Sequence, residues 1–349
     1  MIKENNKKIF FIGIGGIGMS GIAEFLHYDG FEVSGSDLNE SERTNHLKKL
    51  GINICIGHKV ENIKSIDLVV YSSAVKMDNI EILEAQKKNI PIIKRAEMLG
   101  ELIKLKDTSI AISGTHGKTT SCSMLSCILV EANLNPTVII GGIVNNFGSN
   151  TLSGTGDLIV VEADEFDRSF LKLNPNYACI TSLDSDHLDI YEDSNSLIEA
   201  FEQFKNNILE GGFLISHEDT KIKSKKYGII ESSDYLAKNI INNKNFSQFD
   251  LCFNGGIIEN LKIHLQGLHN VMNSVAAVSI AIELGISDKK ILEALKTFKG
   301  IERRFSYKID NETMVLIDDY AHHPEEIKQV YKTLKLIYPN DNLLVVFQP

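Results

Sequence analysis

The chain has 349 residues and a formal net charge of −10, with 43% hydrophobic and 23% charged residues. This length predicts two or three domains, and the composition is that of a globular protein, which excludes disordered and collagen-like chains. The acidic balance argues against a surface that coats nucleic acid. Five scattered cysteines without CxxC spacing predict neither a disulfide framework nor a zinc site, so we expect a reduced, cytoplasmic protein.

The N-terminus begins basic and turns apolar, as a signal peptide does. Glycines at positions 13, 15, 16 and 18 break its apolar stretch, and no cleavage pattern follows. We therefore interpret this segment as a strand that runs into a glycine loop. No run of about 18 apolar residues occurs in the sequence, and we expect no membrane span.

Short apolar runs alternate with longer helical patterns through the first two thirds of the chain. This alternation is typical of a parallel sheet that helices cover on both faces. The strands are predicted at residues 8–12, 31–35, 68–71, 109–113, 137–140, 158–162 and 177–181.

A charged link at residues 101–107 and the end of an amphipathic helix near residue 300 suggest two domain boundaries. After the second boundary the pattern predicts a strand at 314–318, a helix at 324–337 and a strand at 343–347, so this last domain is expected to be cut short. The sequence thus predicts an α/β protein with a Rossmann-like N-terminal domain (1–106), a central P-loop ATP-binding α/β domain (107–300) and an incomplete C-terminal α/β domain (301–349).

The first chemical motif is a GxGxxG sequence that begins at Gly13, between a predicted strand and a predicted helix. Glycines there allow a tight turn and let backbone N–H groups approach a pyrophosphate at the helix N-terminus. Asp37 ends the next strand about 20 residues on, where an acid can bind a ribose hydroxyl. The pattern favours a nucleotide ligand; the alternative is a glycine-rich turn that serves only helix–strand packing.

The second motif is GTHGKTT at residues 114–120, again between a strand and a helix. We expect Lys118 to reach the β- and γ-phosphates of ATP and the hydroxyl of Thr119 to bind Mg²⁺, while the loop N–H groups hold phosphate oxygens. Ile112 stands where the strict GxxxxGK[ST] pattern has glycine, so the loop is a variant P-loop.

Two acidic clusters follow at the ends of later strands. Glu162, Asp164 and Glu165 lie where a metal ligand or a water-orienting group belongs in a P-loop protein. His187, which stands among three aspartates at residues 184–189, is a candidate ligand of a second divalent ion. The alternatives are solvated acids for the first cluster and a helix-capping pair for the second.

Further polar clusters contain His269 and Asn270 before a long apolar helix, Arg304 in an RRF sequence, and Asp319 and His322 in DDYAHHP. They fit functional loops, helix caps and plain surface charge alike. The combination of two phosphate-binding signatures is more informative. A dehydrogenase leaves the P-loop without a role and a simple kinase leaves the N-terminal loop without one, whereas an enzyme that uses ATP on a nucleotide-bearing substrate explains both.

The ordered motifs GIGGIGMSGIAEFL, SGSD, YSSAV, IIKRAEML, SGTHGKTT, VEADEFDRSFL, DSDHLDIY, GLHNVMN, RRF and DDYAHHP resemble those of the Mur ligase family across almost the whole chain. The resemblance implies that the N-terminal domain binds the UDP part of a sugar nucleotide, not NAD. The implied UDP-sugar residues are Gly15, Gly16, Gly18, Ser36, Asp37, Ser72, Ser73 and Arg95.

The same resemblance implies the ATP, metal and catalytic residues. The implied ATP-binding residues are Gly114, Thr115, His116, Gly117, Lys118, Thr119, Thr120, Asn270, Arg304 and Asp319. The implied metal ligands are Thr119, Glu162 and His187, and the implied catalytic residues are Lys118, His116 and His187. His322 is expected near the same cleft. Some family members carry a carbamylated lysine; Lys205 is the nearest candidate, but its offset from His187 does not match well, and we do not assign the modification to it.

The implied reaction is the ATP- and Mg²⁺-dependent joining of L-alanine to the lactyl carboxylate of UDP-N-acetylmuramate, in peptidoglycan precursor synthesis. The carboxylate attacks the γ-phosphate of ATP, and the amine of alanine displaces phosphate from the resulting acyl phosphate. The alternatives are a recycling ligase that adds a peptide to the same sugar nucleotide, an NAD-dependent oxidoreductase, and a module that only binds nucleotides. We expect no nucleic-acid partner and no membrane insertion.

Overall fold

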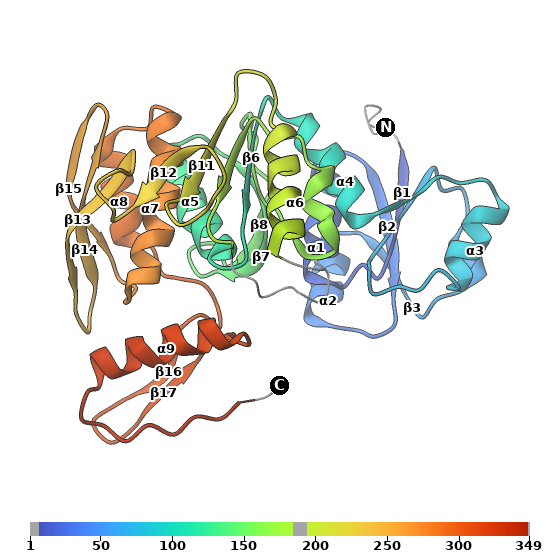
Figure 1. Ribbon diagram of the computed structural model, residues 1–349. Coiled ribbons are helices and arrows are strands. Elements are labelled where there is room, and N and C mark those ends of the chain that lie inside the picture. Colours follow the sequence, from blue (N-terminus) through green and yellow to red (C-terminus); the bar gives the residue numbers. More distant parts are fainter. Residues whose placement is uncertain (1–6, 184–193, 348–349) are drawn as a thin grey trace.

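The computed structural model describes residues 7–183 and 194–347, and its N-terminal part contains a five-stranded parallel sheet in the order β3-β2-β1-β4-β5 (Figure 1). The strand order reverses between β1 and β4, which is where Rossmann-like sheets bind their ligands. The elements are β1 (Lys8–Ile12), α1 (Ile17–Tyr28), β2 (Glu32–Asp37), α2 (Glu42–Lys49), β3 (Asn53–Ile56), a 3₁₀ turn (Val60–Asn62), β4 (Leu68–Tyr71), α3 (Ile80–Lys87), β5 (Ile92–Lys94), α4 (Arg95–Leu102) and a second 3₁₀ turn (Ile103–Leu105).

The central part contains a ten-stranded sheet in the order β15-β14-β13-β12-β11-β10-β6-β9-β7-β8, parallel from β13 to β7 and antiparallel at both edges. Its first elements are β6 (Thr108–Ser113), α5 (Lys118–Glu131), β7 (Thr137–Val144), β8 (Ser149–Leu152), β9 (Leu158–Glu162), a 3₁₀ helix (Phe166–Lys172), β10 (Tyr177–Ile180) and α6 (Ser194–Asn206). They are followed by β11 (Phe213–His217), β12 (Lys225–Gly228), β13 (Tyr235–Asn242), β14 (Ser247–Phe253), β15 (Gly256–Ile263), α7 (Leu268–Glu283) and α8 (Asp288–Thr297).

The C-terminal residues, drawn in red in Figure 1, form a small lobe with a two-stranded sheet of its own. It consists of an antiparallel hairpin, β16 (Ser306–Asp310) and β17 (Val315–Asp318), followed by α9 (Pro324–Ile337). We call residues 301–347 the C-terminal segment.

The N-terminal and central parts share an extensive contact through α1. Asn150, which is 4% exposed, donates from Nδ2 to the carbonyl oxygens of Ile17 (3.1 Å) and Ile140 (3.2 Å). Arg43 donates to Asn150 Oδ1 (2.8 Å) from the opposite side. One apolar cluster continues from the N-terminal sheet into the central one. The two parts are therefore packed together along the face that carries the glycine loop.

The fold prediction is confirmed as an α/β protein with a parallel N-terminal sheet and a central sheet, but several elements differ from the expected ones. The predicted strand at 343–347 is absent among the described residues, and this stretch is exposed with no neighbouring strand to pair with. The expected charged link at 101–107 contains a helix end whose Leu102 and Ile103 are buried, so it is docked rather than open. Helix α5 begins at Lys118, three residues before the predicted start.

None of the described helices combines the length and the apolar composition that a bilayer crossing requires.

Candidate functional site

The turn between β6 and α5 requires glycine at two positions. Gly114 and Gly117 have φ values of 128° and 82°, in the left-handed region that strains other residues. A Cβ atom on Gly114 would collide with Thr181 Oγ1, and one on Gly117 would collide with Asn273 Oδ1. The glycines therefore let the loop turn tightly against its neighbours at the N-terminus of α5, where helix N–H groups favour an anion.

The loop is fixed by the residues that follow β10. The backbone N–H of Thr115 donates to the carbonyl oxygen of Ser182 (3.2 Å), and the N–H of His116 donates to Ser182 Oγ (2.9 Å). The hydroxyl of Thr181 donates to the carbonyl oxygens of Ser113 (3.1 Å) and His116. Because β10 pairs with β6, these bonds tie two adjacent strand ends together and set the loop conformation.

Lys118, the first residue of α5, lies in a closely bonded charged pair. Its Nζ donates to the carbonyl oxygen of Gly114 (2.6 Å) and to both carboxylate oxygens of Glu165 (2.9 and 2.8 Å). Glu165 is fully buried. Burial by itself lowers the pKa of the lysine, but the charges of Glu165 and Glu162 outweigh burial and raise it. The P-loop lysine is therefore a charged, pre-oriented ammonium group.

Thr119 and Glu162 form the pair that a magnesium site would use. The threonine hydroxyl donates to both carboxylate oxygens of Glu162 (3.0 and 2.9 Å), and the N–H of Gly141 donates to Glu162 Oε2 (2.8 Å). Hydroxyl and carboxylate oxygens are the donors that Mg²⁺ prefers, and the pair lies beside the loop. These donors therefore fit the ion.

The remaining proposed metal ligand, His187, lies outside the described residues. Within residues 7–183 and 194–347, no group of three or more histidine, cysteine, aspartate or glutamate side chains is arranged to hold a metal ion. Lys205, considered above as a candidate for modification, pairs with Glu202 on α6 (3.1 Å).

The glycine loop after β1 is held against the end of β2. Gly15 N donates to Asp37 Oδ2 (2.8 Å), and a Cβ atom on Gly15 would lie 2.8 Å from the same oxygen. A Cβ atom on Gly18 would lie 2.8 Å from Arg95 Nη1. Both glycines are thus needed for the close approach of an acidic and a basic side chain, and Gly13 (φ 79°) makes the turn itself.

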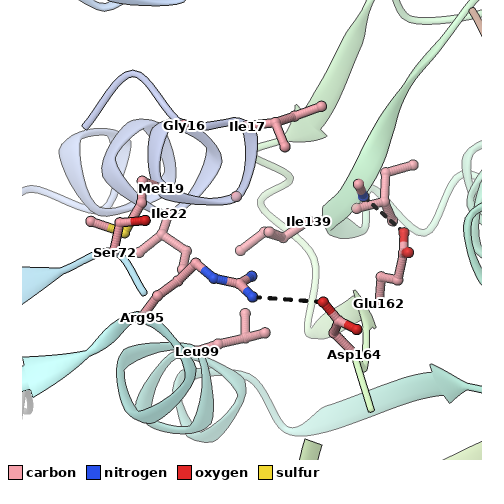
Figure 2. Close-up of a pocket in the computed structure, with 13 residues that line it drawn as sticks. Gly16, Ile17, Met19, Ile22, Ser72, Arg95, Leu99, Ile139, Glu162 and Asp164 are labelled. Carbon is pink, nitrogen blue, oxygen red and sulfur yellow. Dashed lines mark hydrogen bonds and ion pairs between the residues drawn. The ribbon is translucent and has the colours of Figure 1, made fainter. Parts of the chain in front are cut away.

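A cavity of about 270 Å³ lies between α1 and the ends of β7 and β9 (Figure 2). Its lining consists of Gly16, Ile17, Gly18, Met19, Ile22, Ser72, Arg95, Leu99, Ile139, Ile140, Gly141, Glu162 and Asp164. Figure 2 shows Arg95 extending across it toward Asp164, at 4.0 Å. One cavity therefore joins predicted UDP-sugar residues to the carboxylate that contacts Thr119.

Four predicted UDP-sugar residues do not line this cavity: Gly15, Asp37, Ser36 and Ser73. Ser36 is fully buried and donates to Glu81 Oε2 (2.6 Å), while His58 Nδ1 lies 3.1 Å from the serine hydroxyl and 2.7 Å from the same carboxylate oxygen. Ser73 is exposed. Glu81 is itself fully buried, so this group stabilises the end of β2 from within the N-terminal part.

The predicted adenine and C-terminal residues lie on α7 and in the C-terminal segment. Asn270 is 8% exposed and donates to the carbonyl oxygen of Gln266 (2.9 Å). Asp319 accepts hydrogen bonds from the N–H groups of Phe305 and Ala321 (2.7 Å each), so it shapes its own loop. The guanidinium of Arg304 lies over the ring of Tyr320 and contacts Glu326, as described below.

Three residues that contact the P-loop region are not among the candidates predicted from the motifs. Asn273 faces Gly117, Ser182 holds the loop backbone, and Glu326 approaches His116. Glu165 is among the predicted acids, but its pairing with Lys118 is not predicted. The spacing of two asparagines in GLHNVMN could have indicated Asn273, since residues three apart share a helix face. No sequence signal indicates Glu326, because its contact depends on how the C-terminal segment docks.

Comparison with known families matches three stretches of the chain. Residues 8–107 match "Mur ligase family, catalytic domain", residues 112–281 match "Mur ligase middle domain", and residues 303–349 match "Mur ligase, glutamate ligase domain". The chain therefore belongs to the Mur ligase family, ATP-dependent enzymes that form amide bonds.

Individual relatives narrow the class further. The chain is 47% identical to the UDP-N-acetylmuramate–L-alanine ligase of Aquifex aeolicus, over 100% of this chain and 79% of that protein. It is 43% identical to the enzyme of the same name from Hydrogenobaculum, over 100% of this chain and 80% of that protein.

Solved structures with a similar fold are ligases of the same family. The UDP-N-acetylmuramate–alanine ligase of Thermotoga maritima superposes with a TM-score of 0.84 at 33% identity, covering 95% of this chain and 78% of that one. A murein peptide ligase from Psychrobacter arcticus superposes with a TM-score of 0.78 at 26% identity, covering 94% of this chain and 76% of that one.

Proposed function

We propose that this chain is a UDP-N-acetylmuramate–L-alanine ligase, which uses ATP to join the amine of L-alanine to the lactyl carboxylate of the sugar nucleotide. The observation that carries the proposal is the shared cavity, since it places Arg95 and the glycine-loop residues against Glu162, which contacts the P-loop residue Thr119. The 47% identity to a ligase of that name over the full chain supports the choice of substrates.

ATP binds at the loop between β6 and α5 in this proposal. Gly114, Thr115, His116 and Gly117 present the loop backbone, and Lys118 and Thr119 begin α5. The ammonium group of Lys118 donates its hydrogen bonds to Gly114 and Glu165. A phosphate oxygen of ATP therefore binds this group by replacing one of these acceptors.

Magnesium is held by Thr119 and Glu162 in this proposal, with His187 as a further ligand. Bound Mg²⁺ neutralises charge on the phosphoryl oxygens during transfer. The hydrogen bond from the N–H of Gly141 holds the carboxylate of Glu162 with its oxygens toward the loop.

The sugar nucleotide binds along the N-terminal glycine loop. Gly15, Gly16 and Gly18 leave the start of α1 open for the pyrophosphate, and Arg95 provides a positive charge on the opposite wall of the cavity. Asp37 holds the loop through Gly15 and places a carboxylate near the ribose position.

The reaction follows from these placements. The lactyl carboxylate attacks the γ-phosphate of ATP, ADP leaves, and the amine of alanine then attacks the acyl phosphate and expels phosphate. Arg95 in the cavity and Lys118 at the P-loop hold the two anionic reactants side by side and offset their mutual repulsion, so the chain contributes mainly positioning and charge stabilisation. Asn270 on α7, with Arg304 and Asp319 from the C-terminal segment, completes the ATP site.

We assign three domains to the chain, at 1–106, 107–300 and 301–349, which the family matches at 8–107, 112–281 and 303–349 support. We place the reaction in the cytoplasm, in keeping with the five free cysteines.

A second candidate is a ligase that adds a peptide to the same sugar nucleotide, favoured by the likeness to a murein peptide ligase. That likeness has the lower TM-score and the lower identity of the two structures compared. Parallel assays with L-alanine and with a peptide that begins with L-alanine would separate the two candidates.

Calorimetric titration tests the nucleotide assignment independently of turnover. The proposal predicts saturable binding of UDP-N-acetylmuramate and no binding of NADH, with weaker sugar-nucleotide binding in the Arg95→Ala variant. Binding of NADH without binding of the sugar nucleotide would overturn the assignment of the N-terminal site.

A further inference from the structure

The carboxylate of Glu326 lies where the C-terminal segment meets the P-loop. Its Oε1 is 3.4 Å from His116 Nδ1 and 3.6 Å from Arg304 Nη1. Its Oε2 accepts a hydrogen bond from the backbone N–H of His322 (3.3 Å) and is 3.6 Å from His322 Nδ1. One side chain of α9 therefore contacts a residue of the ATP loop and two residues of its own segment.

These contacts are not those of an exposed surface pair. The Glu326 side chain is only 14% exposed and belongs to the first turn of α9, where the helix N-terminus favours a negative charge. Burial by itself would raise the pKa of the carboxyl group, but the contact with His116 and the charge of Arg304 lower it to about 2. Glu326 is therefore a fixed anion at neutral pH.

Glu326 also limits where Arg304 can point. The guanidinium carbon lies 5.5 Å from the ring centroid of Tyr320, so the ring supports one face while Glu326 lies beside Nη1. A guanidinium group has five N–H donors, and the carboxylate faces one of its three nitrogens. Within residues 7–183 and 194–347 no acceptor contacts Nε or Nη2, so their donors can bind phosphate oxygens.

The same carboxylate links this arginine to the ATP loop. His116 lies in the ATP loop, and its backbone N–H donates to Ser182. The His116 ring lies edge-on to the His323 ring, with 6.1 Å between the ring centroids. Both His323 and Glu326 are at the start of α9. Docking of this helix start thus brings the C-terminal cation and the loop histidine to the same carboxylate oxygen.

We propose that Glu326 is a positioning residue of the ligase reaction: it docks the C-terminal segment onto the ATP loop and holds Arg304 and His116 in the orientation in which they face the phosphates of ATP. This inference rests on the proposed ligase function. It assigns to Glu326 no direct contact with the reacting atoms.

The test compares Glu326→Gln, which keeps the shape and removes the charge, with Glu326→Asp, which keeps the charge on a shorter side chain. Glu312→Gln is the matched control, because it removes an exposed carboxylate from the same segment. Phosphate release with ATP, UDP-N-acetylmuramate and L-alanine gives kcat and each KM. Hydrogen–deuterium exchange of the ligand-free chain reports docking without any need for turnover.

The proposal predicts that Glu326→Gln lowers kcat by about 10- to 100-fold, because Arg304 and His116 stabilise the transition state less when they are misplaced. The KM for the sugar nucleotide should be unchanged. Exchange should become faster both in the first turn of α9 and in the loop around His116. Glu326→Asp should recover part of kcat, and Glu312→Gln should match the wild type in both measurements.

Two results would overturn the proposal. An unchanged kcat in Glu326→Gln, with or without a lower KM for ATP, would mean that Glu326 is dispensable or merely competes with phosphate. Faster exchange in α9 with no change in the loop would mean that no coupling exists. If the wild-type chain binds no UDP-N-acetylmuramate by calorimetry, the proposed function fails, and the exchange measurement alone decides whether Glu326 couples the two elements.

Discussion

The ion pair between Lys118 and Glu165 gives a quantitative prediction about stability that is separate from catalysis. The two side chains are 13% and 0% exposed, and the ammonium contacts both carboxylate oxygens. Replacing Lys118 by methionine keeps the length of the side chain but removes the ammonium group that pairs with both oxygens of the buried Glu165. Removing one partner of a buried pair costs about 3–5 kcal/mol.

The cost depends on which partner remains charged. In the double variant Lys118→Met/Glu165→Gln neither charge remains, so most of the loss should be regained, with a coupling free energy of about 2 kcal/mol or more. Lys104→Met is the matched control, since Lys104 is 54% exposed in its pair with Glu101 (2.7 Å). An exposed pair of this kind contributes about 0.5 kcal/mol or less.

Urea unfolding followed by circular dichroism measures these differences, and the chain has no tryptophan to follow by fluorescence. The expected order of stability is wild type and Lys104→Met, then the double variant, then Lys118→Met. If Lys118→Met unfolds at the same urea concentration as the wild type, the ion pair between Lys118 and Glu165 does not stabilise the folded chain. All variants at position 118 should lack ligase activity.

Three further predictions concern the loop, the metal and pH. Gly117→Ala should lower ATP affinity by about tenfold or more in calorimetry, because a Cβ atom there is strained at φ 82° and collides with Asn273; equal affinity would contradict the loop geometry. Glu162→Gln should raise the Mg²⁺ concentration needed for half-maximal phosphate release by about 10- to 100-fold, and an unchanged requirement would remove Glu162 from the metal site. Burial lowers the pKa of His269 from 6.5 to about 4. As the pH falls, the unfolded chain therefore binds this proton before the folded chain does. The free energy of unfolding should keep its full His269 contribution above pH 6.5 and lose at most about 3 kcal/mol of it between pH 6.5 and 4. Urea midpoints should fall across that range in the wild type, and less steeply in His269→Gln, which lacks this titration.

The parts of the fold that follow local rules could be read from the sequence. The strands at Lys8–Ile12, Leu68–Tyr71 and Leu158–Glu162 and the helix Pro324–Ile337 are predicted with their observed bounds. Each of these strands is a short run rich in β-branched residues and aromatics, and the helix begins with proline at its first position.

The errors occur where a neighbouring element decides the outcome. Residues 343–347 have the apolar character of a strand, but a strand needs a partner, and in the part of the chain that the structure describes β16 and β17 pair only with each other. The predicted start of α5 is three residues too late, because the GKT sequence resembles a loop when the glycine turn before it is not known. Residues 101–107 look like a linker by charge, whereas Leu102 packs in the core.

The candidate site shows the same division. The glycine loops and the acid Glu162 follow from motif spacing, because their chemistry is local to a strand end. The contacts of Glu165, Asn273 and Glu326 join residues 47 or more positions apart, and only the packed fold brings them to the P-loop. Ser36 shows the reverse case, since its motif predicts a ligand contact while its hydroxyl bonds to buried Glu81.

The most direct test of the ligase assignment is to incubate the chain with UDP-N-acetylmuramate, ATP, Mg²⁺ and L-alanine and to analyse the products by mass spectrometry. The account predicts the sugar nucleotide extended by one alanine, with one ADP and one phosphate per product, and no product with Lys118→Ala. Formation of the alanine product at an undiminished rate by Lys118→Ala, or extension by a peptide in preference to alanine, would contradict it.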